Sequence, residues 1–348
     1  MKNLRSIGLC YTVVVLLAGC APQAVEKPVD MVWPNPPETP RIRYIRSLSQ
    51  VDEFGRSGRS WLETLFGEDV SGAMSKPYGV ATDQEGRVYV TDSGQGAVWV
   101  FDEKEKKVSF LGTSGQGQLK QPIGIAVDDR GIIFVSDVVL QRVFGLDREG
   151  NLVVAIGKKD ELINPSGLAI DRASGRLYVA DPRAHKIRVY NSADGSFAFE
   201  FGKRGKEDGE LNFPTNLFIG NGKLYITDTG NFRIQIFDLD GKYLKKFGDV
   251  GDGPGQLARP RGVAADSEGH IYVADAAFDN FQIFDEEGRL YLFVGAAGHR
   301  PGTFWLPAGM HIDNEDKIYV VDSYNRRVQV FQYLGEKYRA KVAKTKAG

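Results

Sequence analysis

Short apolar runs separated by polar turns fill the chain from about residue 77 to residue 333. The segments "RGVAAD", "HIYVADA", "FQIFD" and "LYLFVG" follow one another, with turn sequences such as "SEG" and "EEGR" between them. Runs of this length, rich in Val, Ile, Tyr and Phe and bounded by Gly and Asp, are typical of β-strands. The pattern predicts a unit of four short antiparallel strands with no long helix inside it.

The four-stranded unit recurs six times, and a proline precedes the first strand of each copy. These prolines are Pro77, Pro122, Pro165, Pro214, Pro260 and Pro307. The interval varies from 43 residues (122 to 165) to 49 residues (165 to 214). A period of roughly 40–50 residues with four strands per repeat is typical of propeller blades. The sequence therefore predicts an all-β fold, a six-bladed β-propeller of four-stranded antiparallel blades.

A motif within each copy carries a family resemblance. The copy begins with Pro-x-Gly-apolar-Ala-x-Asp, and its later part is best formed in "TDTGNFRIQIFD" (227–238) and "VDSYNRRVQVF" (321–331). These motifs resemble the NHL repeat, and the resemblance extends over residues 77–333. It implies a six-bladed β-propeller of the NHL type. Propellers of this type include lyases, protein-binding platforms and RNA-binding proteins, so the resemblance leaves the function open.

One carboxylate returns in every copy, directly after the second strand. The six residues are Asp92, Asp137, Asp181, Asp228, Asp275 and Asp322. In four copies a cation follows five positions later, at Arg142, Lys186, Arg233 and Arg327. An aspartate that begins a turn accepts backbone N–H groups and pairs with a nearby cation. Because a catalytic carboxylate is needed only once, six copies indicate a structural role.

The first 19 residues resemble a bacterial lipoprotein signal peptide. Lys2 and Arg5 precede an apolar run that is too short to span a bilayer, which takes ~20 residues. The run ends in Leu-Ala-Gly-Cys, the pattern of a lipobox. We therefore expect residues 1–19 to be removed and Cys20 to be acylated, which makes the lipid bilayer a partner of the chain. A plain secretory signal with an incidental cysteine is the alternative.

Residues 20–40 combine the lipidated cysteine with a proline-rich tether. Six of the 15 prolines lie here, and proline favours extended backbone. Ala21, in place of an aspartate, favours the outer membrane as the location of this cell-envelope lipoprotein; whether it faces the periplasm or the exterior stays open. Cys10 and Cys20 are the only cysteines, so processing would leave the mature chain without a disulfide or a thiolate nucleophile.

The propeller is expected at residues 41–340 as a monomer, followed by a basic tail at 341–348. Its sixth blade needs a fourth strand, and two segments compete for that place: "RIRYIRSLS" (41–49) and the C-terminal "KYRAKV". We favour 41–49, because a strand from the other terminus closes the ring and covers its edge. A short helix is predicted at 60–67, where Ser60 and Glu63 have capping-box spacing.

One face of a propeller carries two kinds of loop: those between the second and third strands of a blade, and those that join one blade to the next. We call it the variable face, because the blade-to-blade loops of this chain differ widely in sequence. Turns on the opposite face, such as "DSEGH" and "DEEGR", are short and alike. Binding sites are built from variable loops on a rigid scaffold. The candidate ligand-binding residues of this face and its channel rim are Tyr78, Arg183, Thr215, Arg259, Arg261, Arg300, Trp305 and Tyr324. Pairing of Arg261 with Asp252 or Asp279 is the structural alternative to ligand binding.

The net charge and the histidine content limit the classes of function that the sequence allows. The formal net charge of −1 gives no field that attracts nucleic acid, so no nucleic-acid partner is expected. NHL-like amidating lyases bind a metal ion through histidines. The candidate ligands in this chain would be His185, His299 and His311. No spacing motif links these three histidines, so we expect no metal or other cofactor. We therefore predict a non-enzymatic platform that binds an envelope protein or a polysaccharide. The alternative is a metal-dependent lyase or hydrolase with its site in the central channel.

Overall fold

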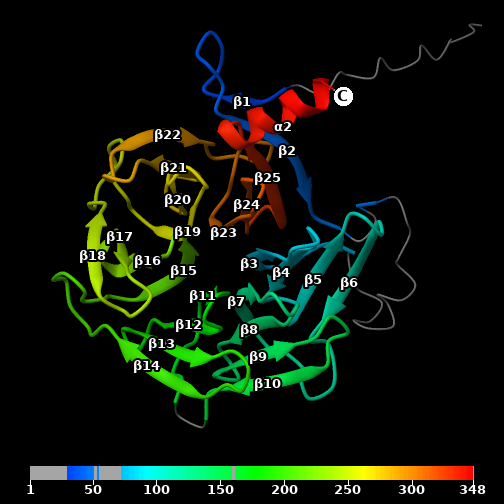
Figure 1. Cartoon of the computed structure of the whole chain (residues 1–348), viewed down its shortest axis with the longest axis vertical. Coiled ribbons are helices and arrows are strands. Elements are labelled where there is room, and N and C mark those ends of the chain that lie inside the picture. Colours follow the sequence, from blue (N-terminus) through cyan, green and yellow to red (C-terminus); the bar gives the residue numbers. More distant parts are fainter. Residues whose placement is uncertain (1–29, 51–52, 55–71, 159–160, 348) are drawn as a thin grey trace, which may run out of the picture. The chain divides into compact units, whose positions relative to one another are not determined.

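The computed structural model describes residues 30–50, 53–54, 72–158 and 161–347. Within these ranges the chain forms six β-sheets arranged as blades around a central axis (Figure 1). The predicted signal peptide, Cys20, the first part of the tether and the predicted helix at 60–67 lie outside the described residues. No helix in the described ranges is long and apolar enough to cross a membrane.

Five blades consist of four consecutive strands each. Blade 1 contains β3 (Pro77–Thr82), β4 (Val88–Asp92), β5 (Ala97–Asp102) and β6 (Lys107–Leu111). Blade 2 contains β7 (Pro122–Val127), β8 (Ile133–Asp137), β9 (Arg142–Leu146) and β10 (Leu152–Ile156). Blade 3 contains β11 (Leu168–Asp171), β12 (Arg176–Asp181), β13 (Lys186–Asn191) and β14 (Phe197–Phe201). Blade 4 contains β15 (Pro214–Gly220), β16 (Lys223–Asp228), β17 (Arg233–Phe237) and β18 (Tyr243–Phe247). Blade 5 contains β19 (Pro260–Ala265), β20 (Ile271–Asp275), β21 (Asn280–Phe284) and β22 (Leu290–Val294).

The sixth blade joins the two ends of the propeller. It contains β23 (Pro307–Ile312), β24 (Lys317–Asp322), β25 (Arg327–Tyr333), β2 (Ile42–Leu48) and the short β1 (Val32–Trp33). β2 pairs antiparallel with β25, from Ile42 opposite Tyr333 to Leu48 opposite Val328 (Figure 1). The strand at the N-terminal side of the propeller is therefore the one that closes the ring.

The alternative closing segment at the C-terminus is a helix. α2 (Glu336–Ala347) includes "KYRAKV" and crosses the boundary at residue 340 where the basic tail was predicted to begin. Alanine, lysine and arginine have high helix propensity, and β2 already occupies the edge of β25. The basic tail is thus helical up to residue 347.

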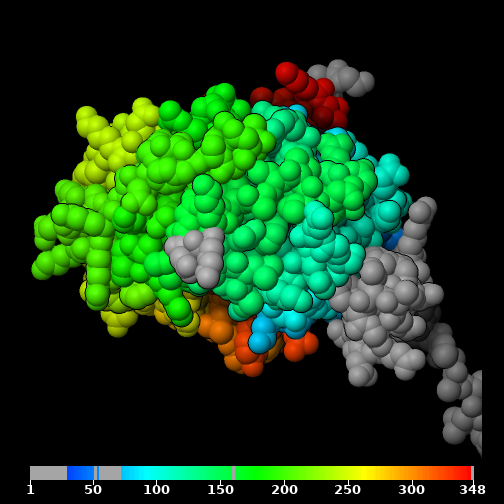
Figure 2. All heavy atoms as spheres, turned by 90° about the horizontal axis from the view of Figure 1, so that it is seen from below, coloured from blue at the N-terminus to red at the C-terminus, as the bar shows by residue number. Residues whose placement is uncertain are grey.

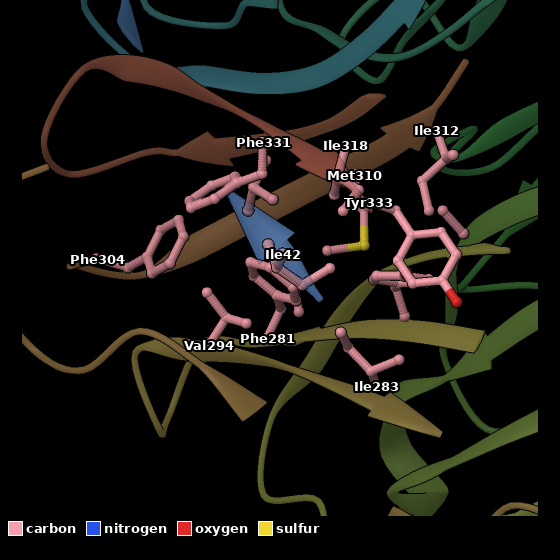
Figure 3. Close-up of a cluster of buried hydrophobic side chains, with 14 residues drawn as sticks. Ile42, Phe281, Ile283, Val294, Phe304, Met310, Ile312, Ile318, Phe331 and Tyr333 are labelled. Atoms are coloured by element: carbon pink, nitrogen blue, oxygen red, sulfur yellow. The ribbon is translucent and has the colours of Figure 1, made fainter. Parts of the chain in front are cut away.

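Six apolar clusters hold the blades together, one at each junction between neighbours. The second strand of each blade is buried almost throughout, which is why these strands read as continuous apolar runs. At the junction of blades 5 and 6, Ile42 of β2 packs with Phe281 and Phe331 (Figure 3). The closing strand therefore contributes to the core as well as to the sheet.

The innermost strands of neighbouring blades touch near the variable face, at the glycine that follows each blade proline by two residues. A Cβ atom on Gly124 would lie 2.0 Å from the Ser166 carbonyl oxygen of the next blade, and one on Gly309 would lie 2.4 Å from that of Tyr78. Blade 4 carries Asn216 at the equivalent position. We call this ring of close contacts the neck of the channel.

The repeated aspartates are structural, and all six side chains are fully buried. Asp92 accepts hydrogen bonds from the backbone N–H groups of Ser75 (2.6 Å), Lys76 (2.9 Å) and Gly94 (3.0 Å). The first two belong to the loop that enters the blade, and the third belongs to the loop after the second strand. Each carboxylate thus connects two loops of the variable face.

The predicted cation partner is present in only two of the four copies. Arg233 Nε lies 2.8 Å from Asp228, and Arg327 Nε lies 2.7 Å from Asp322. Lys186 pairs with Glu200 instead, because its side chain leaves the strand on the outer side of blade 3. Arg142 is exposed and forms no ion pair with any described residue, so the prediction was wrong for these two copies.

We expect Asp228→Ala to lower the free energy of unfolding by about 3 kcal/mol. The substitution removes the carboxylate that pairs with the buried Arg233 guanidinium, and it leaves Arg233 Nε and the backbone N–H of Asn212 without an acceptor. The matched control is Asp238→Ala in the same blade, where the lost bonds to Asp240 and Lys242 lie at the surface and the cost should stay below about 1 kcal/mol. Urea unfolding of both variants measures the difference; equal costs would contradict the structural role.

Candidate functional site

Exposed apolar side chains gather on the variable face. Among the described residues it carries Val139, Ile163, Phe213, Val250, Trp305, Leu306 and Tyr324. The other exposed large apolar residues, Ile45, Val153, Phe197, Leu244 and Phe293, are spread singly along the outer strands of the blades. Figure 2 shows the propeller from its edge, with α2 (red) projecting from one face and the orange segment that contains the β22–β23 loop projecting from the other.

Trp305 and Tyr324 form an exposed aromatic pair on this face. Their ring centroids are 4.4 Å apart with an interplanar angle of 28°, and their exposed fractions are 39% and 58%. His299 packs against Trp305 at 4.8 Å, and its Nδ1 lies 2.6 Å from Asn325 Oδ1. Asn325 Nδ2 in turn donates to Asp322, so the buried aspartate of blade 6 supports the loop under the pair. The sequence prediction placed both aromatic residues on this surface, and the structure brings them together.

Arg261 reaches across the channel mouth from blade 5 to blade 1. Its Nη1 lies 3.4 Å from the hydroxyl oxygen of Tyr78, a long hydrogen bond. Within the part of the chain that the structure describes, no carboxylate pairs with Arg261, and Asp279 instead accepts a bond from the backbone N–H of Leu306 (2.7 Å). The predicted pairing with Asp252 or Asp279 is therefore absent, and a half-buried guanidinium remains beside the mouth.

The remaining predicted residues have separate environments. Thr215 is buried, and its Oγ1 lies 2.6 Å from Thr229 Oγ1, so it stabilises the rim. Arg183, Arg259 and Arg300 are exposed on different loops. The backbone N–H of Arg259 donates to Asp275, and the carbonyl of Arg300 accepts from Arg327. These residues surround the mouth without forming one cluster.

A cavity of about 650 Å³ lies on the other side of the neck, and the sequence reasoning did not identify it. All six innermost strands line it, together with the turns after them and Lys337 of α2. None of the eight predicted binding residues is part of its lining. A signal was present in the sequence: four blades carry alanine at one position of the first strand, and three of these alanines line the cavity. The four residues are Ala81, Ala126, Ala169 and Ala264, of which Ala264 is not part of the lining.

The three candidate metal ligands have different partners. His185 is buried, with Nδ1 3.3 Å from the backbone N of Phe213, whereas His311 lies in the cavity with Nε2 2.9 Å from Thr82 Oγ1. His299 belongs to the aromatic pair on the variable face. Over residues 30–50, 53–54, 72–158 and 161–347, no three His, Cys, Asp or Glu side chains are grouped so that they could hold a metal ion.

Two histidines give the protein opposite pH responses. Burial lowers the pKa of His311 to about 3 from 6.5, so its protonation favours the unfolded chain. The hydrogen bond to Asp266 raises the pKa of His270 above 6.5, although burial opposes this. The contribution of His311 is therefore complete above pH 6.5 and falls as the pH decreases toward 3. The contribution of His270 is complete below pH 6.5 and falls as the pH rises through its folded-state pKa.

We expect the wild-type protein to lose stability relative to His311→Leu between pH 7.5 and pH 5, by up to about 2 kcal/mol. Relative to His270→Gln, the wild type should lose free energy of unfolding as the pH rises, which is the opposite pH dependence. Urea unfolding of the three proteins at both pH values checks the signs. If the His311→Leu variant shows the same pH dependence as the wild type, the imidazole does not remain neutral in the cavity.

Two family models match the chain. The model described as a 6-bladed beta-propeller matches residues 204–277 and 263–342, and the NHL repeat model matches residues 74–101 and 162–190. Together they match parts of five blades, namely blades 1, 3, 4, 5 and 6. The six sheets agree with the first description.

Comparison with known proteins finds the propeller in different contexts. The chain is similar to "Protein brain tumor" of Drosophila melanogaster, with 32% identity over 112 residues, which are 31% of this chain and 10% of that protein. It covers no more than 24% of the length of the other curated relatives compared. Among solved structures, an auxiliary nutrient binding protein from Bacteroides thetaiotaomicron has a TM-score of 0.58 at 16% identity, covering 76% of this chain and 71% of that chain. A gluconolactonase from Xanthomonas campestris has a TM-score of 0.59 at 15% identity, covering 85% and 98%. Identities this low show the fold alone.

Proposed function

Since the chain is a six-bladed β-propeller built from NHL repeats, we propose that it is an envelope-anchored lipoprotein whose variable face binds another envelope protein. One observation supports this proposal above the others: seven large apolar side chains are exposed on the loops of one face. Exposed apolar groups collected on one face, with arginines among them, have the composition of a protein interface. The nutrient binding protein with the same fold is consistent with a binding role.

The chemistry of the face favours a protein over a polysaccharide. Sugar rings stack on aromatic side chains, but Val139, Ile163, Val250 and Leu306 offer aliphatic surface with no hydrogen-bonding capacity. Aliphatic surface gains free energy only when apolar area on the partner covers it, by about 25 cal/mol per Å². The Trp305–Tyr324 pair would act as the anchor, because large aromatic residues dominate interface energetics.

Arg261 gives the proposed interface a charge preference. Its guanidinium has one long hydrogen bond and no described carboxylate partner, so it is available for a carboxylate or carbonyl group of the partner. The loops around it add the exposed Arg183 and Arg259. We therefore expect the partner to present an acidic group beside apolar residues. The metal-dependent alternative has no group of metal-binding side chains to support it within the described ranges, and we do not propose it.

A photo-crosslinking experiment in intact cells tests the binding face. p-Benzoylphenylalanine replaces Tyr324 in one variant and Phe293 in the control; both side chains are exposed aromatics, but Phe293 lies on the outer strand of blade 5. We expect a discrete protein adduct from position 324 alone. Trp305→Ala and Arg261→Ala should each reduce this adduct at least tenfold, with melting temperatures within a few degrees of the wild type, since ~2 kcal/mol is the scale of an interface hot spot.

Three outcomes would contradict the proposed interface. Equal adducts from positions 324 and 293 would show that contact is not selective. An adduct that contains polysaccharide rather than protein would select the other class of partner. Full adduct formation in both Trp305→Ala and Arg261→Ala would place the interface away from the channel mouth.

Envelope anchoring has a separate test. We expect Cys20→Ser to move the protein from the membrane fraction to the soluble fraction without changing its melting temperature, because the earliest described residues that pack on the core are Val32 and Trp33, well after the predicted acylation site. The control is Cys10→Ser, which leaves the predicted acylation site intact and should still sediment with membranes. A folded Cys20→Ser protein that still sediments would show that the anchor lies elsewhere.

A further inference from the structure

The cavity beyond the neck has the size of a small-molecule site. Its volume of about 650 Å³ lies within the range of roughly 300–1,000 Å³ found for ligand pockets. It begins at the neck, where Gly79, Gly124, Asn216 and Gly309 contribute to the lining, and it extends to the turns of the face opposite the variable face. The neck lies between it and the proposed interface, so the cavity is a different site.

The strands give the cavity wall mostly apolar side chains, whereas the turns at its mouth are polar and charged. At one strand position blades 1, 2 and 3 place the alanines Ala81, Ala126 and Ala169 in the lining, whereas blade 4 places Phe218 and blade 6 places His311 there. The rings of Phe218 and His311 meet edge to face, with centroids 6.2 Å apart. One side of the channel is therefore aromatic, and the other carries the small side chains of the three alanines. This shape suits a flat ring that stacks against Phe218 and His311.

Asn216 Nδ2 at the neck is buried without a partner among the described residues, and His311 adds a polar group deeper in the wall. The Nε2 atom of His311 lies 2.9 Å from Thr82 Oγ1, and its Nδ1 has no hydrogen-bond partner among the described residues. Burial keeps the imidazole neutral over the ordinary pH range. A neutral imidazole with one nitrogen already bonded has one hydrogen bond left to offer to a ligand.

The charges at the cavity mouth disfavour anions. Seven carboxylates and three cations contribute to the lining. The carboxylates are Asp83, Glu85, Asp171, Asp266, Asp313, Glu315 and Asp316, and the cations are Arg172, Lys317 and Lys337. An excess of one sign in a cleft repels ligands of that sign. Several of these carboxylates already have partners, such as Arg87 for Asp83 and His270 for Asp266, so they do not form an open cation site either.

We propose that the cavity binds an uncharged, largely apolar ring compound whose one hydroxyl or amino group forms a hydrogen bond with His311. The apolar side chains of the strands make burial of a charged ligand costly, and the unpaired ring nitrogen of His311 rewards a polar group on the ligand. The aromatic side of the channel selects a flat ring, and the small alanine side chains of blades 1 to 3 leave space for it.

Three probes with the same ring system test the proposal by isothermal titration calorimetry at pH 7.5. Naphthalene has no hydrogen-bonding group, 1-naphthol has one hydroxyl, and 1-naphthoate carries a negative charge. We expect saturable binding of one 1-naphthol per chain, about five- to tenfold weaker binding of naphthalene and no measurable binding of 1-naphthoate. Failure of 1-naphthol to bind, or equal binding of 1-naphthoate, would overturn the proposal.

Two variants locate the binding. Ala169→Phe adds a large side chain to the alanine side of the cavity wall and should weaken 1-naphthol binding at least tenfold; Phe218 and His311 show that this strand position accepts a large side chain. The matched control is Ala193→Phe, the same substitution in an exposed turn of blade 3, which should leave binding within twofold. Unchanged 1-naphthol binding by a folded Ala169→Phe protein would place the probe outside the cavity.

His311→Leu tests the polar contact and remains informative if Ala169→Phe does not fold. It should weaken 1-naphthol about five- to tenfold and leave naphthalene binding unchanged, because only the hydroxyl uses the imidazole. Equal loss for both probes would show that His311 acts only through the shape of the wall. Trp305→Ala should alter neither probe, which separates this site from the proposed protein interface.

Discussion

The fully buried aspartate after the second strand of each blade is the interaction on which the variable face depends. Backbone N–H groups from the incoming loop and from the loop after the second strand converge on one carboxylate. Both loops would otherwise leave buried donors unpaired, which costs more than the bonds themselves contribute. The repeat therefore provides the same support at six places, and the loops can differ in sequence without losing their position.

The difference between the repeated blade framework and the variable loops explains which features could be predicted from the sequence. The blades, the closing strand and the structural role of the aspartates follow from short-range patterns that recur six times. A strand assigned wrongly in one blade would not match the equivalent strands of the other five blades, so the six copies check one another. The helix α2 was not predicted because a single segment outside the repeat has no other copies to check it, and "KYRAKV" was considered only as a strand.

The candidate site was less predictable, because it depends on contacts between blades. The positions of Trp305 and Tyr324 on the variable face followed from the repeat, but their stacking depends on two loops that are 19 residues apart in the chain (324 − 305). The partner of Arg261 is Tyr78 of a blade that is not its neighbour, and no local pattern relates them. The predicted pairing of Lys186 with Asp181 failed within one blade: Lys186 pairs with Glu200 of β14, and Arg188 lies 3.9 Å from Asp181.

Positions at which one blade differs from the others indicate more about a candidate binding site than the motif that all blades share. At the neck, Thr91 and Ser136 donate to the carbonyl oxygens of Ile123 and Ser166 in the next blade. In blade 4 the equivalent Thr227 hydroxyl has no partner and Asn216 replaces the glycine beside it, so the junction with blade 5 relies on Thr229 and Pro260 instead.

The same blade places Phe218 where four others have alanine. Blade 4 thus departs from the repeat both at the neck and in the cavity wall, and Arg261 at the mouth belongs to the next blade. With Phe218 in blade 4, Arg261 in blade 5 and His311 in blade 6, three adjacent blades place large side chains along the channel where other blades have smaller ones. This difference between the blades is a structural reason to look for ligands at the channel axis.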